Sequence, residues 1–366
     1  MSINGDYKAF LASKATRTEM RGFEPLWIPD FLFPFQRHLV EWAIRKGKAA
    51  LYEDCGLGKG PQALVWAENV VRYTNKPVLI VAPLAVSAQM IREGEKFGIS
   101  CKRTRNGKVY KGINVTNYER LKFYKTEDFI GIVCDEASIL KSFSGKYRKE
   151  ITEFAAKTKY TLLCTATPAP NDYVELGNSS EATGNMGRNQ MLRTFFISEE
   201  DETGNIESTH HWRLKGYATN DFWQWVSTWA RAVRKPSDLG FEDGDFNLPE
   251  LKTTQHTIPS PNSRRTLIPV LARTLDQQRK ERWATLVPRC EKAAEIIPKD
   301  RSTLVWCHLN KEGDLLEKII DDAVQIQGSD KEEVKEERFM AFIDGQIRVL
   351  VTKPKIGGFG LNLQHC

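Results

Sequence analysis

The sequence predicts an α/β protein in which parallel sheets are flanked by helices on both faces. Short runs of β-branched and apolar residues recur along the chain, nearly continuous in hydrophobicity, as in strands buried on both faces. Segments with apolar residues at helical spacing lie between these runs, which is typical of parallel sheets. The first run ends at a glycine-rich turn that leads into a helix. In the first half of the chain, the runs of strand length are residues 49–52, 78–81, 113–116, 130–134 and 161–164.

A second set of strand-length runs follows a passage rich in proline. Prolines at 249, 259, 261 and 269 mark this passage. Beyond it, helical segments alternate with runs at residues 302–307, 324–326 and 347–352. We therefore expect an N-terminal extension at 1–30, a first lobe at 31–250, a linker and helix at 251–298, and a second lobe at 299–366.

Composition indicates a globular protein of about two domains. Of the 366 residues, 41% are hydrophobic and 27% are charged, so wholesale disorder is not expected. The net charge of +6 permits an anionic partner without requiring one. The seven cysteines form no Cys-x-x-Cys pair, which argues against a zinc site or a disulfide framework and for a reducing compartment. We expect no membrane partner and no secretory signal, because no apolar run approaches the roughly 18 residues of a membrane span.

The turn after residues 49–52 carries the main chemical signal. It reads Glu-Asp-Cys-Gly-Leu-Gly-Lys-Gly-Pro from Glu53 onward. A strand that breaks at glycines before a helix directs backbone N–H groups into one hollow, which suits a phosphate. Lys59 would add a charge that reaches the outer phosphates of a nucleoside triphosphate. An ordinary strand-to-helix turn is the alternative, because Glu53 and Gly60 depart from the pattern G-x-x-x-x-G-K-[ST].

Gly60 stands where P-loop enzymes carry a hydroxyl residue. That hydroxyl ligates the magnesium ion that bridges the β- and γ-phosphates, and glycine has no side-chain oxygen. The sequence therefore predicts that nucleotide binding survives and that turnover suffers.

Polar side chains also follow two of the later strands, where ligands gather in parallel sheets. Asp135 and Glu136 come after the run at 130–134. Adjacent carboxylates suit a magnesium ion and an attacking water, although an exposed acidic turn is the alternative. Thr165 and Thr167 follow the next run. Their hydroxyls would link a nucleotide pocket to a neighbouring surface. The alternative is that the segment is only a turn that ends at proline.

Three further features allow a functional and a structural interpretation. The amide of Gln36 suits the N6 and N7 edge of adenine, but Gln36 is equally a residue at a helix start. Lys102, Arg103 and Arg105 belong to a basic stretch without an acid, which is either a contact to a phosphate backbone or a solvated loop. Within residues 178–247, one helical face is predicted to be buried, with a stacking surface for nucleic acid as the alternative. That face comprises Phe222, Trp225, Val226 and Trp229.

In their order and spacing, these segments resemble the motifs of the superfamily 2 helicases. Within that superfamily they are similar to the Swi/Snf-type DNA translocases and their compact phage and bacterial relatives. Two segments favour this branch over the DEAD-box RNA helicases: Asp-Glu-Ala-Ser followed by Ile-Leu-Lys, and Gly-Phe-Gly-Leu-Asn-Leu-Gln from Gly358. The resemblance runs from about residue 31 to the C-terminus, with residues 178–247 outside it.

The resemblance implies two RecA-like lobes with ATP and Mg²⁺ in the cleft between them, the second lobe being incomplete at the C-terminus. Lys59, Asp135 and Glu136 would be catalytic, with Asp135 holding Mg²⁺. The implied ATP-binding residues are Gln36, Gly56, Leu57, Gly58, Lys59, Gly60, Gly358 and Gly360. Thr165 and Thr167 would couple the nucleotide site to nucleic acid. The implied nucleic-acid-binding residues are Pro83, Asn117, Lys141 and Thr352, together with Lys102, Arg103 and Arg105.

The function that follows from the resemblance is an ATP-dependent motor that moves along DNA. We expect single-stranded or duplex DNA to be held mainly by its phosphate backbone. The expected location is the bacterial or phage-infected host cytoplasm. The chain ends where motif VI, with its transition-state arginines, would be expected, so weak ATP hydrolysis is predicted. The alternative is a non-hydrolysing, nucleic-acid-binding scaffold that keeps the helicase fold.

Overall fold

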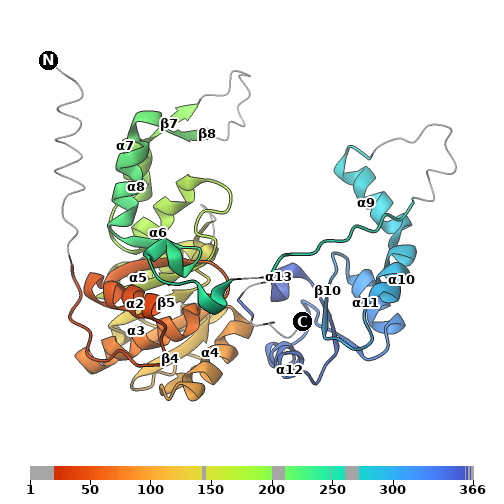
Figure 1. Ribbon diagram of the computed structural model, residues 1–366, viewed down its shortest axis with the longest axis horizontal. Helices are drawn as coiled ribbons and strands as arrows, with labels where there is room; N and C mark the ends of the chain where they lie inside the picture. Colours follow the sequence, from red (N-terminus) through yellow and green to blue (C-terminus); the bar gives the residue numbers. More distant parts are fainter. Residues whose placement is uncertain are drawn as a thin grey trace. The chain divides into compact units, whose positions relative to one another are not determined.

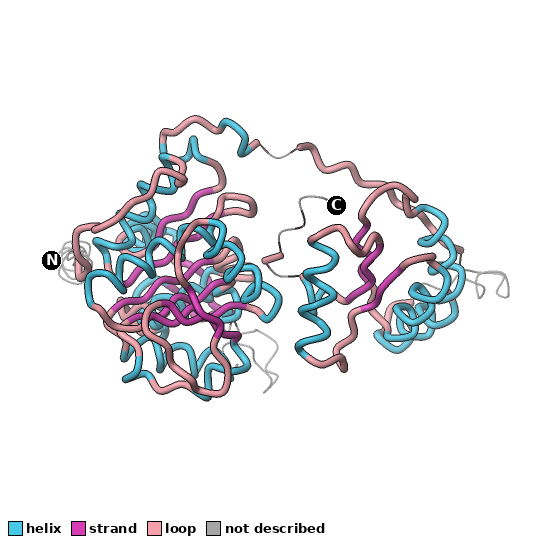
Figure 2. Tube along the Cα trace, turned by 90° about the horizontal axis from the view of Figure 1, so that it is seen from below, coloured by secondary structure: helices cyan, strands magenta, loops and turns pink. Residues whose placement is uncertain are grey.

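The computed structural model describes residues 20–141, 146–199, 211–247, 249–259, 272–358, 360, 361 and 363 (Figures 1 and 2). The chain divides into two compact units, the first up to residue 248 and the second from residue 249. Each unit has its own parallel sheet flanked by helices, which confirms the fold class predicted from the sequence. In the described part of the chain, no helix is long and apolar enough to cross a membrane.

The first unit is built on a seven-stranded sheet whose neighbouring strands are all parallel. All five strand-length runs predicted in this region are strands. The edge strands β3 and β9 were not predicted. In order across the sheet, the strands are β3 (Cys101–Arg103), β4 (Ile113–Asn117), β2 (Val78–Ala82), β5 (Gly131–Asp135), β6 (Tyr160–Cys164), β1 (Lys48–Glu53) and β9 (Ala230–Val233).

In the central strands β2, β5, β6 and β1, alternate residues enter two separate hydrophobic cores, because successive side chains of a strand point to opposite faces. In β1, Ala49 and Leu51 belong to one core, and Ala50 and Tyr52 belong to the other. The helices that share the core of Leu51 are α2 (Pro34–Lys46), α3 (Lys59–Thr74) and α4 (Leu84–Lys96). The helices on the opposite face are α5 (Lys146–Lys157), α6 (Leu176–Ala182), α7 (Arg188–Phe195) and α8 (Thr219–Ser227). A two-stranded antiparallel ribbon, β7 (Phe196–Glu199) with β8 (His211–Leu214), lies between α7 and α8 in the sequence (Figure 1).

The aromatic face of α8 is buried, which confirms the structural interpretation of that segment. Phe222 and Trp229 are fully buried, and Trp225 is 4% exposed. The ring of Trp229 meets the ring of Tyr52 of β1 edge to face, at a centroid distance of 6.2 Å. The aromatic side chains of residues 219–229 therefore support the strand that leads into the glycine-rich turn.

The second unit contains a three-stranded parallel sheet in the order β10 (Thr303–Trp306), β12 (Val349–Thr352) and β11 (Ala323–Gln325). Its core joins these strands to α10 and α11. An ion pair between Arg289 and the buried Glu312, at 2.6 Å, connects the same two helices. The helices of this unit are α9 (Leu275–Ala284), α10 (Leu286–Ile296), α11 (Asn310–Ile319), α12 (Glu332–Ile343) and α13 (Pro354–Gly357).

We predict that Trp229→Ala lowers the free energy of unfolding by about 3–5 kcal/mol, because a fully buried indole leaves a cavity beneath β1. Urea denaturation measures this loss. Trp223→Ala is the control, since Trp223 lies on α8, which ends shortly before Trp229, and is 40% exposed, so its replacement should cost less than that of Trp229. Equal losses in the two variants would contradict the buried position of Trp229.

Candidate functional site

The glycine-rich turn joins β1 to α3 at the carboxyl edge of the sheet. Gly56 and Gly58 have φ angles of 83° and 79°, a left-handed region that glycine adopts without steric cost. Gly58 precedes the first turn of α3, and Lys59 is the first residue of that helix. The backbone of residues 56–60 thus approaches a helix N-terminus, as a phosphate cradle requires.

Two buried amides hold this turn in place. Gln36 Nε2 donates to the carbonyl oxygen of Leu57 at 2.8 Å, and Gln62 Nε2 donates to the same carbonyl at 3.2 Å. The other end of the Gln36 amide accepts from the backbone N–H of Phe33 at 3.0 Å. A Cβ at Gly58 would come within 2.4 Å of Gln36 Nε2, so only glycine allows this approach. The structure therefore places Gln36 both at a helix start and against the turn.

Lys59 folds back onto the start of the turn. Its Nζ donates to the backbone oxygens of Glu53 and Asp54, at 2.9 and 3.0 Å. Both acceptors are neutral carbonyl oxygens. An anionic oxygen can replace them, because it adds the attraction between opposite charges to the hydrogen bond.

The acidic pair lies at the same edge as the turn. Leu51 of β1 and Asp135 of β5 both pair with Cys164 of β6, so the end of β5 lies level with Leu51, two residues before the end of β1. Glu136 follows with a φ of 52°, a strained conformation for a residue with a side chain. This register places the acidic pair at the same edge of the sheet as the turn that carries Lys59.

Electrostatics links the three groups. Burial, and then the charge of Glu136, raise the pKa of Asp135 to about 7, while the charge of Lys59 opposes the rise. Burial also raises the pKa of Glu136, opposed by Lys59 and by a hydrogen bond with Thr165. The ammonium group of Lys59 thus acts on both carboxylates. A divalent cation would stabilise their charged forms in the same way.

The donors present fit a magnesium ion that arrives with a nucleotide. Magnesium is bound by one or two carboxylates together with phosphate oxygens and waters, and seldom by a cage made of protein alone. Asp135 and Glu136 supply the carboxylates. Among the described residues, no three His, Cys, Asp or Glu side chains are grouped as metal ligands.

Two further acids near the turn were missed by sequence reasoning. Glu53, fully buried, accepts from Gln62 Nε2 at 2.7 Å, and its pKa is raised to about 7 by burial. Glu93 of α4 faces Gly60, where a Cβ would lie 2.0 Å from Glu93 Oε2. In the sequence, Glu53 stands out only because it replaces the first glycine of the pattern G-x-x-x-x-G-K-[ST]. Glu93 stands among Arg92, Glu95 and Lys96, which is typical of a solvated helical face.

Several residues assigned to nucleic acid also follow strand ends in the first unit. Pro83 follows β2, and Asn117, which is buried, is the last residue of β4 and pairs with Ala82. Lys141, exposed, ends the short helix η3 (Ala137–Lys141) after β5. The turn, the acidic pair and these residues therefore share one edge of the sheet.

The basic stretch lies on and directly after β3, the outermost strand of the sheet beyond β4. Lys102 and Arg105 are exposed, whereas Arg103 is half-buried. Lys102 Nζ lies 5.4 Å from the centre of the Tyr110 ring.

The other three predicted residues belong to the second unit. Thr352 ends β12, is fully buried, and donates its hydroxyl to the carbonyl of Ile326 at 3.0 Å. Gly358 follows α13, and Gly360 has a φ of 63°. The roles assigned to them stay predictions.

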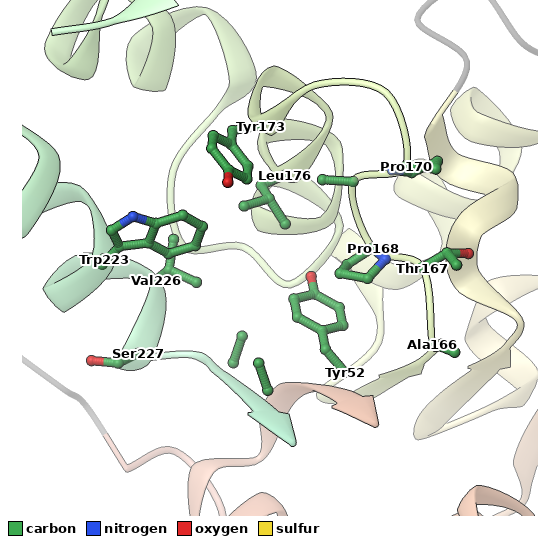
Figure 3. Close-up of a pocket in the computed structure, with 13 residues that line it drawn as sticks. Tyr52, Ala166, Thr167, Pro168, Pro170, Tyr173, Leu176, Trp223, Val226 and Ser227 are labelled. Carbon is green, nitrogen blue, oxygen red and sulfur yellow. The ribbon is translucent and has the colours of Figure 1, made fainter. Parts of the chain in front are cut away.

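A separate cavity of about 470 Å³ lies beside Thr167 (Figure 3). Its walls are mainly apolar and include Pro168, Trp223 and Val226, with Tyr52 below them. Thr165, by contrast, is buried, and its Oγ1 accepts from the backbone N–H of Thr167 at 3.1 Å. The cavity has no charged lining residue, so it differs in chemistry from the charged edge around Lys59.

We predict that the stability of Glu53→Gln relative to the native chain increases with pH. The raised pKa of Glu53 means that the folded state holds the proton more tightly than the unfolded state. Protonated Glu53 therefore contributes its full stability to the native chain below the ordinary pKa of a glutamate. The native chain loses this contribution as the pH rises through about 7, whereas Glu53→Gln has no such group to lose it from. Urea denaturation at about pH 5 and about pH 8 measures the difference. Glu119→Gln, at an exposed position, is the control, and a Glu53→Gln difference that is equal at both pH values would contradict the prediction.

Comparison with known proteins agrees with the motifs. No family model matches the chain. Over 173 residues, 41% of this chain, the sequence is 27% identical to the DNA annealing helicase and endonuclease ZRANB3 of Mus musculus, and this match spans 16% of that relative's length.

Solved structures with similar folds include two of the Sulfolobus solfataricus SWI2/SNF2 ATPase core. The one in complex with dsDNA is 18% identical, with a TM-score of 0.46, and covers 94% of this chain and 82% of its own. The other is 17% identical, with a TM-score of 0.48, and covers 94% and 80%. The UvsW helicase of bacteriophage T4 is 13% identical, with a TM-score of 0.36, and covers 50% and 66%. The sequence match supports the resemblance found in the motifs, and the chain is similar to the Swi/Snf-type ATPases of helicase superfamily 2.

Proposed function

We propose that this chain is an ATP-dependent motor, a DNA helicase or translocase, that binds Mg-ATP at the turn of residues 56–60. The observation that supports the proposal most is that Lys59, Asp135 and Glu136 lie at one edge of the sheet, where the charge of Lys59 lowers the pKa of both carboxylates. A solvated acidic turn, the alternative for this pair, would not combine burial with the charge of a lysine from another loop.

In this proposal, the residues of the turn bind and orient the triphosphate. The N-terminus of α3 attracts the phosphates, and Lys59 exchanges its two backbone acceptors for phosphate oxygens. Asp135 holds the magnesium ion, which when bound neutralises charge that develops on the phosphates. Glu136 orients the attacking water and accepts its proton, a role that suits a carboxylate whose pKa is raised.

The second unit would complete the cycle. Gly358 and Gly360 lie in the segment that resembles motif V, and we assign that segment to the nucleotide. Binding of ATP would favour one arrangement of the two units and hydrolysis another, so that differential affinity becomes stepwise movement along DNA. The contacts to DNA would be mostly to phosphates, through the residues assigned above.

Gly60 favours a second candidate function. Since glycine supplies no hydroxyl for magnesium, we propose that turnover is reduced. If turnover is absent, the chain acts as a nucleic-acid-binding scaffold. Titration with fluorescent ATP separates the two candidates, because a scaffold with a decayed site would bind no nucleotide.

We predict that Lys59→Ala weakens ATP binding by about 10- to 100-fold, the worth of a hydrogen bond to a charged group. Glu136→Gln should keep the affinity and lower DNA-stimulated hydrolysis by about 10²- to 10⁴-fold, the usual contribution of a general base. Fluorescent ATP titration and a phosphate-release assay measure the two effects. Lys76→Ala, at an exposed lysine before β2, is the control, and unchanged binding in Lys59→Ala would refute the proposed site.

We predict that alanine at Lys102, Arg103 and Arg105 reduces the dependence of DNA affinity on salt. For duplex DNA, removing one phosphate-binding side chain decreases the slope of log affinity against log salt by about 0.9. Fluorescence anisotropy over a salt series measures the slope. The control is alanine at Lys157 and Lys159. Both lysines are exposed and directly precede β6, which begins at Tyr160, so they lie at the amino end of this strand. If the slope of the variant equals that of the native chain, the basic stretch is a solvated loop and does not contact phosphates.

A further inference from the structure

The carboxylate of Glu93 fills the space next to Gly60. A Cβ built on Gly60 would lie 2.0 Å from Glu93 Oε2 and 3.0 Å from Glu93 Cδ. Gly60 is the second residue of α3, directly after Lys59. The acidic group therefore stands where a serine or threonine after the lysine would place its side chain.

Glu93 is held in this position from its own helix. Gln89 Nε2, one turn earlier on α4, donates to Glu93 Oε1 at 2.9 Å. For Oε2, the structure shows no hydrogen-bond donor among the described residues. One oxygen is thus fixed and the other is turned toward position 60.

The same carboxylate also acts on Asp135. The charge of Glu93 contributes to the raised pKa of Asp135. Burial raises the pKa of Glu93 itself, and the bond from Gln89 and the charge of Lys96 oppose the rise only in part. Two carboxylates that disfavour each other's charge are stabilised when a divalent cation binds between them.

We propose that Glu93 replaces the hydroxyl missing at position 60 and, together with Asp135, holds the magnesium ion of the bound nucleotide, directly or through a water. This inference rests on the proposed nucleotide site. Two carboxylates with phosphate oxygens and waters are a usual set of ligands for magnesium. Gly60 then serves to admit the acid, and Glu93 of α4 compensates for the missing hydroxyl in magnesium binding, while turnover stays reduced.

The test is the ratio of the ATP dissociation constants without and with magnesium. N-methylanthraniloyl-ATP is titrated into the full chain in EDTA and in MgCl₂. Glu93→Gln should lower this ratio by about tenfold or more, with metal-free affinity unchanged or tighter because a negative charge is removed. Glu95→Gln is the matched control, since Glu95 is an exposed glutamate on the same helix, and it should keep the native ratio.

A second variant reverses the change. Gly60→Thr combined with Glu93→Ala supplies a hydroxyl and removes the acid that occupies its place, so it should return the ratio toward the native value. Gly60→Thr alone must displace the Glu93 carboxylate, so the effects of the two substitutions should not be additive. If Glu93→Gln does not fold, the double variant decides, and failure to recover magnesium dependence overturns the inference.

The outcomes separate this inference from the proposed function. A native chain that binds no nucleotide in either buffer overturns both. Suppose that the native chain binds ATP more tightly with magnesium and that Glu93→Gln has the same ratio of dissociation constants as the native chain. This result overturns only the role of Glu93.

Discussion

One ammonium group lies among buried acids at the carboxyl edge of the first sheet. Lys59 opposes the raised pKa values of Glu53, Asp135 and Glu136, and Glu93 adds to the negative charge that Asp135 experiences. Burial of these carboxylates around Lys59 costs stability, because a charge removed from water needs a partner. The parallel sheet imposes this arrangement, since the end of β5 lies level with Leu51 of β1 on the other side of β6. A bound cation would pair with the carboxylates, and a polyphosphate would pair with Lys59.

The aromatic region between residues 178 and 247 supports the strand that leads into the glycine-rich turn. β9 pairs with β1 along its free side, and Asp54 N–H donates to the carbonyl of Val233 at 2.9 Å, directly at the start of the turn. The buried Trp229 packs on Tyr52 beneath the same strand. The turn that carries Lys59 is therefore fixed by β6 on one side and by β9 on the other.

The parts of this site that follow a strand along the chain could be predicted from sequence. The turn after β1 and the acids after β5 are each indicated by a buried run followed by glycines or carboxylates. Glu93 could not be found this way, because its partner Gly60 is distant in sequence and its helical neighbours are charged. The strand β9 was missed because Ala-Arg-Ala-Val contains an arginine, whose guanidinium in fact lies 4.1 Å from the centre of the Trp42 ring. Tertiary packing decided both cases.

The central claim is that Lys59 and the acids of β5 and α4 surround one nucleotide. A crystal structure of the chain with a non-hydrolysable ATP analogue and Mn²⁺ tests it most directly, because the anomalous signal locates the metal independently of the nucleotide. The account predicts phosphates over residues 56–60, with Lys59 released from the Glu53 carbonyl, and a manganese peak beside Asp135. A nucleotide bound elsewhere, or a metal peak away from Asp135, would contradict the account.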